Sequence, residues 1–144
     1  MSLVRQVLDK KKGDVATIDR DASVQEAADL MHSRHIGALI VLHDGNIVGI
    51  FTERDLLNRV VAEKKDPVKV QVVEVMTTQV AVCSPDTPIE SCRAAMTRNK
   101  MRHLPVVNDG KLVGIISSGD ILARELQEQE ETIRWLHEYM HGPN

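Results

Sequence analysis

Two short motifs in this sequence combine a hydroxyl and a carboxylate at the start of a predicted helix. Thr52 precedes Asp55 by three residues, and Ser117 precedes Asp120 by the same interval. In one interpretation each pair is a capping box that satisfies the first free N–H groups of the helix. In the other, the positive helix end attracts a phosphate while the carboxylate accepts hydrogen bonds from two ribose hydroxyls. Both interpretations stay open from these residues alone.

A third motif occurs near the C-terminal end of the chain. Residues 137–141 read HEYMH, which matches the HExxH pattern of zinc peptidases. Gly142 and Pro143 end the helix directly afterwards, and only Asn144 follows, so no third ligand comes from downstream. We therefore expect no peptidase activity and no metal site here.

The elements that position these motifs follow from turn and capping signals. The first half predicts the order β-α-β-β-α: an extended run at 15–18, a helix opened by Ser23-x-x-Glu26, a buried strand at 36–42, a turn at Asp44-Gly45, a return strand at 47–51 and a helix from Thr52. The second half repeats it: an extended run at 80–83, a helix capped by Thr87 with Pro88 first, strands at 104–107 and 112–116 around Asp109-Gly110, and a helix from Ser117.

The two halves are copies of one another. At a shift of 65 residues, 11 positions between 21–57 and 86–122 are identical without a gap. The identities include both turn pairs, both strand glycines and both aspartates of the opening motifs. The sequence is therefore a duplication. Since one copy buries too little surface alone, the two should pack together, which predicts an α+β fold with pseudo-two-fold symmetry.

Shorter segments surround the copies. Residues 3–8 predict a lead-in helix that ends at a lysine cluster, Lys10-Lys11-Lys12. We interpret this cluster as a solvated helix end, with a basic contact patch as the alternative. The predicted domains are 1–66 for the first copy and its lead-in helix, 67–125 for the second copy, and 126–144 for a C-terminal helical extension.

That C-terminal helix carries an apolar stripe with alternating spacings of four and three. Its positions are Leu122, Leu126, Gln129, Ile133, Leu136 and Met140. Such a stripe should be buried against another chain or folded back over the copies. We favour a homodimer, or a higher oligomer, in which this helix takes part. Because Gln129 within the stripe would weaken a simple coiled coil, packing of the helix against the partner's domain stays open as an equal alternative.

Composition narrows the functional classes. With 144 residues, 42% hydrophobic content and a net charge of −3, the chain can bury a core but has no electrostatic footprint for nucleic acid or an anionic membrane. The longest apolar run is too short to span a bilayer, and no signal-peptide core is present. Cys83 and Cys92 predict two reduced, buried thiols, so we expect a cytoplasmic protein.

The motifs resemble those of the CBS domain family in its tandem form, the Bateman module. The resemblance lies in Gly49-Ile50-Phe51-Thr52-Glu53-Arg54-Asp55 and Gly114-Ile115-Ile116-Ser117-Ser118-Gly119-Asp120, and in the strand sequences at 36–41 and 102–107. Val75-Met76-Thr77 is similar to the usual lead-in to a second repeat. The resemblance to the family covers about residues 1–125.

The resemblance implies that a cleft between the copies binds an adenine nucleotide: AMP, ADP, ATP, or also NAD(H) or S-adenosylmethionine. Carried over by position, the aspartates would hold ribose hydroxyls, the hydroxyl residues would contact phosphate or ribose, and main-chain groups would line the adenine. The implied ligand-binding residues are Ile18, Gly37, Ala38, Thr52, Arg54, Asp55, Cys83, Arg102, His103, Ser117, Ser118 and Asp120. Gly37-Ala38 stands where the second copy has Arg102-His103, so the two sites should be unequal.

The predicted function is a regulatory module that binds an adenosyl ligand and signals to a partner protein by a ligand-dependent change in conformation or assembly. The alternative is a structural or assembly module without a ligand. An enzyme is not expected, because no catalytic triad, phosphate-cradling glycine loop or metal set accompanies the motifs.

Overall fold

The computed structural model describes residues 2–11 and 14–142, and these form two compact units. One unit contains residues 13–82, which hold the first copy and the segment after it. The other contains residues 1–12 together with 83–144. Each unit is described by itself. The domain limits predicted from the sequence stay predictions.

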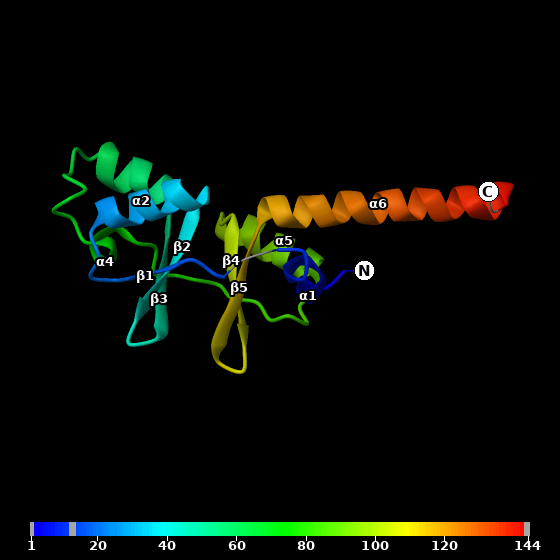
Figure 1. Ribbon diagram of the computed structural model, residues 1–144, viewed down its shortest axis with the longest axis horizontal. Helices are drawn as coiled ribbons and strands as arrows, with labels where there is room; N and C mark the ends of the chain where they lie inside the picture. Colours follow the sequence, from blue (N-terminus) through cyan, green and yellow to red (C-terminus); the bar gives the residue numbers. More distant parts are fainter. Residues whose placement is uncertain (1, 12–13, 143–144) are drawn as a thin grey trace. The chain divides into compact units, whose positions relative to one another are not determined.

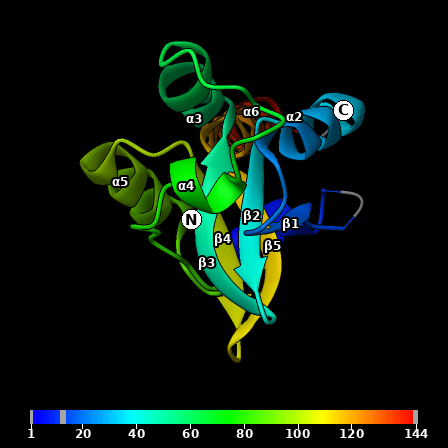
Figure 2. The same cartoon turned by 90° about the vertical axis from the view of Figure 1, so that its left-hand side faces the viewer.

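The unit of the first copy is a three-stranded sheet with helices packed on it. Strand β1 (Thr17–Asp19) pairs in parallel with β2 (Ala38–His43), and β2 pairs antiparallel with β3 (Asn46–Thr52). The helices are α2 (Val24–Arg34), α3 (Glu53–Asp55), the π-helical η1 (Leu56–Val61) and α4 (Val72–Val75). Helices α2 and α3 lie toward the end of the β2–β3 hairpin opposite its turn (Figures 1 and 2).

The unit of the second copy repeats this plan with one strand fewer. It contains α1 (Val4–Leu8), α5 (Ile89–Asn99), the antiparallel pair β4 (His103–Asn108) and β5 (Lys111–Ser117), and the long α6 (Ser118–His141). The counterpart of β1 is reduced to a single parallel bridge between Cys83 and Val106. The extended run predicted at 80–83 is therefore present only as this bridge.

The cores of the two copies use equivalent positions. At the 65-residue shift, buried positions that correspond are Val24 and Ile89, Met31 and Met96, Leu39 and Leu104, Val41 and Val106, and Phe51 and Ile116. These side chains come from the inner face of the first helix and from the central strands. The two copies therefore share the positions that form their cores, as the duplication in the sequence predicts.

Each unit is completed by a short helix that precedes the other copy in the sequence. Helix α4 begins at Gln71, which bridges to Ser23 at the start of α2, while α1 begins at Leu3, which bridges to Pro88 at the start of α5. The backbone bonds are direct: Val24 N donates to Val70 O at 2.9 Å, and Ile89 N donates to Ser2 O at 3.0 Å. The lead-in helix therefore packs with the second copy.

The turn predictions are confirmed, and one cap prediction is wrong. Asp44 and Gly45 have φ of 50° and 79°, the backbone that a type I′ hairpin turn requires, and Asp109-Gly110 matches them. Ser23 Oγ accepts a hydrogen bond from Glu26 N at 3.1 Å, as predicted. Thr87 does not cap α5: Pro88 occupies the N-cap position, and Thr87 Oγ1 accepts instead from Ser84 N at 3.0 Å.

No helix within the described ranges is both long and apolar enough to cross a membrane.

Gly49 on β3 and Gly114 on β5 lie where the segments that precede the two copies in the sequence approach these strands most closely. A Cβ on Gly49 would lie 2.8 Å from the backbone oxygen of Thr77, whereas one on Gly114 would meet only the end of the Leu8 side chain, at 2.6 Å. Gly49→Ala should therefore destabilise the fold by about 1–3 kcal/mol, and Gly114→Ala by less, because a leucine side chain can move and a paired backbone cannot.

Urea unfolding of the two variants checks this expectation. Gly119→Ala is the control, since its Cβ would meet nothing closer than Ser117 Oγ at 3.6 Å. In a helix this change should stabilise by about 0.5–1 kcal/mol. Equal losses of stability in Gly49→Ala and Gly114→Ala would contradict the argument that the backbone near Gly49 cannot move whereas the Leu8 side chain near Gly114 can.

Candidate functional site

The hydroxyl–carboxylate pair of the first copy forms a closed capping box. Asp55 N donates to Thr52 Oγ1 at 3.2 Å, and Thr52 N donates to Asp55 Oδ2 at 3.1 Å. Thr52 has an extended backbone at the end of β3, so the chain turns from strand to helix within one residue. The side chain of Asp55 is 9% exposed. The capping interpretation is thus confirmed for this motif.

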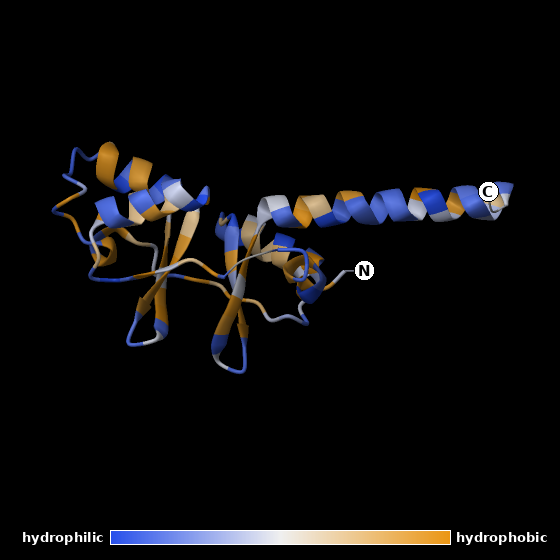
Figure 3. Cartoon of the chain, viewed as in Figure 1, coloured by the Kyte–Doolittle hydropathy of each residue, from blue (hydrophilic) through white to orange (hydrophobic). Residues whose placement is uncertain are grey.

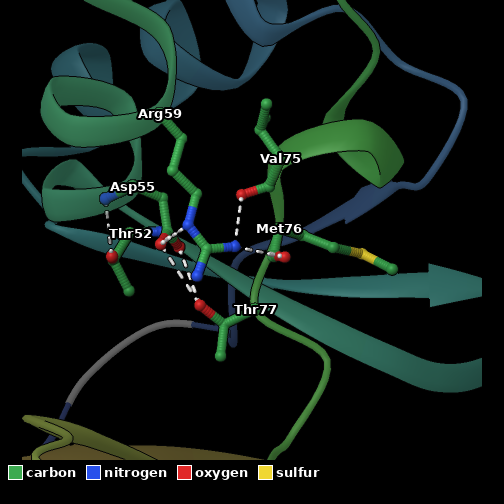
Figure 4. A network of polar contacts seen from close by, with 6 residues as sticks. All are labelled: Thr52, Asp55, Arg59, Val75, Met76 and Thr77. Carbon is green, nitrogen blue, oxygen red and sulfur yellow. Dashed lines mark hydrogen bonds and ion pairs between the residues drawn. The ribbon is translucent and has the colours of Figure 1, made fainter. Parts of the chain in front are cut away.

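Asp55 also links its helix to the segment after α4, as Figure 4 shows. Thr77 Oγ1 lies 3.2 and 3.3 Å from the two carboxylate oxygens, and Arg59 Nε lies 3.7 Å from Oδ1. Arg59 Nη1 in turn donates to the backbone oxygens of Val75 and Met76, at 3.3 and 3.0 Å. The carboxylate is therefore surrounded by partners from its own unit.

Sequence reasoning did not include Arg59 or Thr77 among the site residues. A signal for Arg59 was available, since it stands four residues after Asp55 on the same helical face. The local sequence pattern contains no signal that identifies Thr77. It reaches Asp55 because its backbone pairs with Ile50, through two hydrogen bonds of 2.9 Å each.

The second copy builds the same box with a different cation. Asp120 N donates to Ser117 Oγ at 3.1 Å, and Ser117 N donates to Asp120 Oδ2 at 2.8 Å. Lys11 Nζ donates to the same Oδ2 at 2.8 Å and to Ile115 O at 2.9 Å. The Asp120 side chain is 24% exposed, more than that of Asp55.

Lys10 and Lys11 are exposed just after the end of α1, as a solvated helix end predicts, but both also make contacts that the sequence did not predict. Lys11 contacts Asp120, and Lys10 hydrogen-bonds to Gln127 of α6. Lys12 lies outside the described residues. The physical reason is the packing of the N-terminal segment beside β5 and α6, which a local charge pattern does not reveal.

Equivalent arginines have diverged between the copies. Arg59 and Arg124 correspond at the 65-residue shift, yet only Arg59 reaches the aspartate of its motif. Arg124 Nε instead donates to Ser2 Oγ at 2.7 Å and lies 4.0 Å from the Glu128 carboxylate. Lys11 therefore supplies in the second copy the charge that Arg59 supplies in the first.

The other predicted residues of the first copy gather only in part. Ala38 pairs with Thr52, and Glu53 N donates to Gly37 O at 3.0 Å, so the start of β2 lies beside the helix start. Arg54 is exposed on that helix. Ile18 pairs with Val41, three residues farther along β2 than Ala38.

The second copy shows the same local arrangement. His103 pairs with Ser117, and Ser118 N donates to Arg102 O at 2.9 Å, as Glu53 does to Gly37. The Arg102 and Ser118 residues are exposed. Cys83 N donates to Pro105 O at 3.0 Å, so Cys83 lies farther along β4 than the helix start.

Both cysteines are free thiols and buried, as predicted. Hydrogen bonding to Cys92 and burial raise the pKa of the Cys83 thiol far above its ordinary value. A protonated thiol is a poor nucleophile. Cys83 is therefore suited to packing and backbone contact rather than to covalent chemistry.

The HExxH residues lie on the exposed C-terminal part of α6. The rings of His137 and His141 are 4.6 Å apart, centre to centre. Within residues 2–11 and 14–142, no group of three or more His, Cys, Asp or Glu side chains is arranged to hold a metal ion.

Comparison with known proteins decides the family. The CBS domain matches residues 4–62 and again residues 72–126. This chain belongs to the CBS domain family. Its two copies are tandem CBS repeats, and the resemblance noted in the sequence is confirmed.

Relatives and solved structures agree with this assignment. The CBS domain-containing protein YhcV of Bacillus subtilis is 32% identical over 123 residues, which are 85% of this chain and 87% of that protein. A CBS-domain protein of Burkholderia ambifaria superposes with a TM-score of 0.85 at 37% identity, covering 89% of this chain and 96% of the other. The α+β fold of two CBS repeats and a long C-terminal helix is thereby established.

One structural neighbour carries ligands. The CBS domain pair of protein MJ0100, in complex with 5-methylthioadenosine and S-adenosyl-L-methionine, superposes with a TM-score of 0.76 at 26% identity. The match covers 90% of this chain and 98% of that one. That neighbour therefore binds adenosyl compounds with a pair of CBS domains.

The two donors to Asp120 give a pH prediction. Partial burial of this carboxyl favours its protonated form, but hydrogen bonds from Lys11 and Ser117 outweigh it and hold the pKa below its ordinary 3.8. Because the folded-state pKa is the lower one, the carboxylate stabilises the fold fully above about pH 3.8, and this stabilisation is lost as the pH falls through the folded-state pKa.

We therefore expect the melting temperature of the wild-type chain to fall more steeply in acid than that of Asp120→Asn. Thermal unfolding followed by circular dichroism between about pH 5 and pH 2 measures the difference. Parallel curves for the two proteins would contradict a depressed pKa at this position.

Proposed function

We propose that this CBS protein is a regulatory module that binds an adenosyl ligand at its capped helix starts and catalyses no reaction itself. The carrying observation is that both copies place a hydroxyl, a carboxylate and a strand-start backbone group at the same junction. Such a junction offers acceptors to a ribose and a positive helix end to a phosphate. The ligand-bearing neighbour supports the adenosyl class.

The second copy is the stronger candidate for the principal site. Its helix α6 is 24 residues long, whereas α3 has three residues before the π-helical turn, so α6 offers the fuller dipole. Asp120 is more exposed than Asp55 and carries fewer partners. Arg102 and Ser118 are exposed beside it and would contact phosphate, while the main chain near Cys83 would contact the adenine.

The residues of the first copy would form a weaker, second site. In our proposal Thr52 and Asp55 contact the ribose, Arg54 contacts phosphate, and the main chain near Ile18, Gly37 and Ala38 lines the adenine. Asp55 would have to release Thr77 before it accepted a ribose hydroxyl. That requirement lowers the affinity of the site.

Ligand binding would act by shifting a population between conformations or assemblies, which a regulated protein then detects. The ligand must bind one of these states more tightly, since equal affinity shifts nothing. AMP, ADP, ATP and NAD(H) are the candidates we retain with S-adenosylmethionine, and we place the protein in the cytoplasm. A structural module without a ligand is the alternative.

A thermal-shift panel of AMP, ADP, ATP, NAD, NADH, S-adenosylmethionine and GTP tests the proposal. A ligand that binds only the folded state raises the melting temperature, and a selective response to adenosyl compounds is expected.

Asp120→Asn should lower the affinity for the compound that binds about tenfold or more, because a charged acceptor is lost. Asp109→Asn, at the hairpin turn, is the matched control and should bind as the wild type does.

A flat response to every adenosyl compound would favour the assembly module. Chemical turnover of a bound nucleotide, followed by chromatography, would overturn the non-catalytic assignment.

We further propose that α6 pairs with a second copy of this chain. Each residue from 131 to 140 is exposed, and α6 carries seven large exposed apolar side chains: Leu122, Leu126, Ile133, Trp135, Leu136, Tyr139 and Met140. Hydrophobic bands recur along its whole length (Figure 3). At roughly 100 Å² each, these side chains approach the ~800 Å² that one partner contributes to a standard interface.

The stripe also complements itself. It runs from Leu122 to Met140 and is symmetric about residue 131, so an antiparallel second helix would place Leu126 opposite Leu136 of the second copy. Such two-fold pairing closes on itself and needs no other partner.

Leu136→Glu should convert the dimer to a monomer, measured as molar mass by light scattering after size exclusion at micromolar concentration. Arg134→Glu changes a side chain outside the stripe on the same helix and should leave the mass unchanged. A monomeric wild-type chain would instead support a helix folded back within the molecule.

A further inference from the structure

Among the residues that the structure describes, Lys11 is the side chain from outside the second copy that contacts its Ser117–Asp120 motif. We propose that Lys11 is a specificity-determining residue of this site: it holds Asp120 while no ligand is bound and makes the site prefer adenosyl ligands that carry a phosphate. The inference rests on the proposed function and adds to it the residue that selects the ligand class.

The geometry makes Lys11 a direct competitor of a ribose. Its Nζ lies 2.8 Å from Asp120 Oδ2, and this oxygen also accepts from Ser117 N at 2.8 Å. Both donors use this one oxygen, and a ribose whose two hydroxyls bond to the two carboxylate oxygens needs it as well. Only the Lys11 bond can be given up without uncapping α6, so a ribose bound in this way displaces the ammonium.

The displacement is feasible because the ion pair is partly solvated. The side chains of Lys11 and Asp120 are 38% and 24% exposed. Ion pairs at that exposure contribute little to stability, and a lysine has a long flexible stem that can swing its charge by several ångströms. The second bond, to Ile115 O at 2.9 Å, keeps the ammonium close to β5 and the start of α6.

Charge then decides which ligands are accepted. Once Asp120 bonds to a ribose, the Lys11 ammonium has lost its counter-ion beside the N-terminus of α6, which is itself positive. A phosphate group restores the balance and accepts a charge-assisted hydrogen bond from Lys11. Neutral adenosine leaves the ammonium unpaired, and a sulfonium compound adds a further positive charge.

The first copy has no such device. Arg59, the cation near Asp55, donates to the backbone oxygens of Val75 and Met76 and is fixed by them. Its charge cannot follow an incoming phosphate without breaking the contact between η1 and the segment after α4. Among the described residues, a cation that can pass from the ribose-binding carboxylate to a phosphate is therefore found only in the second copy.

Isothermal titration of AMP and adenosine into three proteins tests the proposal: wild type, Lys11→Met and Lys10→Met. In the wild type, AMP should bind at least about tenfold more tightly than adenosine, from one added charge-assisted hydrogen bond. Lys11→Met should reduce that ratio about tenfold or more, because AMP loses its bond to the ammonium while adenosine no longer has to displace it. Lys10→Met removes a neighbouring charge that contacts Gln127, not Asp120, and should keep the wild-type ratio.

The outcomes separate the two proposals. If wild type binds no adenosyl compound of the thermal-shift panel, the proposed function is overturned, and this inference with it. If wild type binds adenosine as tightly as AMP, or binds neither of the two but another adenosyl compound, or if Lys11→Met keeps the wild-type ratio, this inference is overturned although the proposed function stands.

A second measurement does not depend on the folding of a variant. In wild-type protein with ¹⁵N-labelled lysine, the Lys11 Nζ resonance should shift on addition of AMP, when the ammonium passes from carboxylate to phosphate. An Nζ resonance that AMP leaves unchanged while AMP is bound would overturn the proposal.

Discussion

The backbone pairing between each copy and the short segment that precedes the other copy in the sequence is the constraint on which this structure depends. Ser23 at the start of α2 pairs with Gln71, and Pro88 at the start of α5 pairs with Leu3. These bonds satisfy N–H and C=O groups that would otherwise be left without partners at buried helix starts. The short helices α4 and α1 cover those starts, so each copy takes backbone bonds from residues outside its own β-α-β-β-α sequence.

The same two segments bring Thr77 and Lys11 to the candidate site. Thr77 reaches Asp55 because its segment pairs with β3, and Lys11 reaches Asp120 because its segment lies beside β5. Gly49 and Gly114 allow these approaches, since a side chain at either position would meet the incoming segment. The carboxylates therefore stand where two distant parts of the chain meet. A ligand that bonds to either carboxylate also changes how that segment is held.

Sequence reasoning predicted what local chemistry decides. The turns at Asp44-Gly45 and Asp109-Gly110, the caps at Thr52 and Ser117 and the buried strands follow from side-chain type and period within a few residues. The duplication, together with the motifs that it repeats, predicted the CBS family and the fold. What the sequence missed depends on contacts distant in sequence. Pro88, not Thr87, occupies the N-cap position of α5, and the exposed Lys10 and Lys11 also contact α6, because the N-terminal segment packs against both regions. The six residues 56–61 also adopt π-helical hydrogen bonding, for which we find no signal in their types.

The arrangement of the units also sets an order for folding during synthesis. Residues 2–11 leave the ribosome before residues 13–82, yet their partners lie in residues 83–144. At about 5–20 residues per second, the 70 residues of the intervening unit take roughly 4–14 s to translate. Through that interval the N-terminal segment has no partner of its own unit, while the intervening unit already has all of its sequence. Residues 2–11 are thus made before the first copy but reach their place only after it.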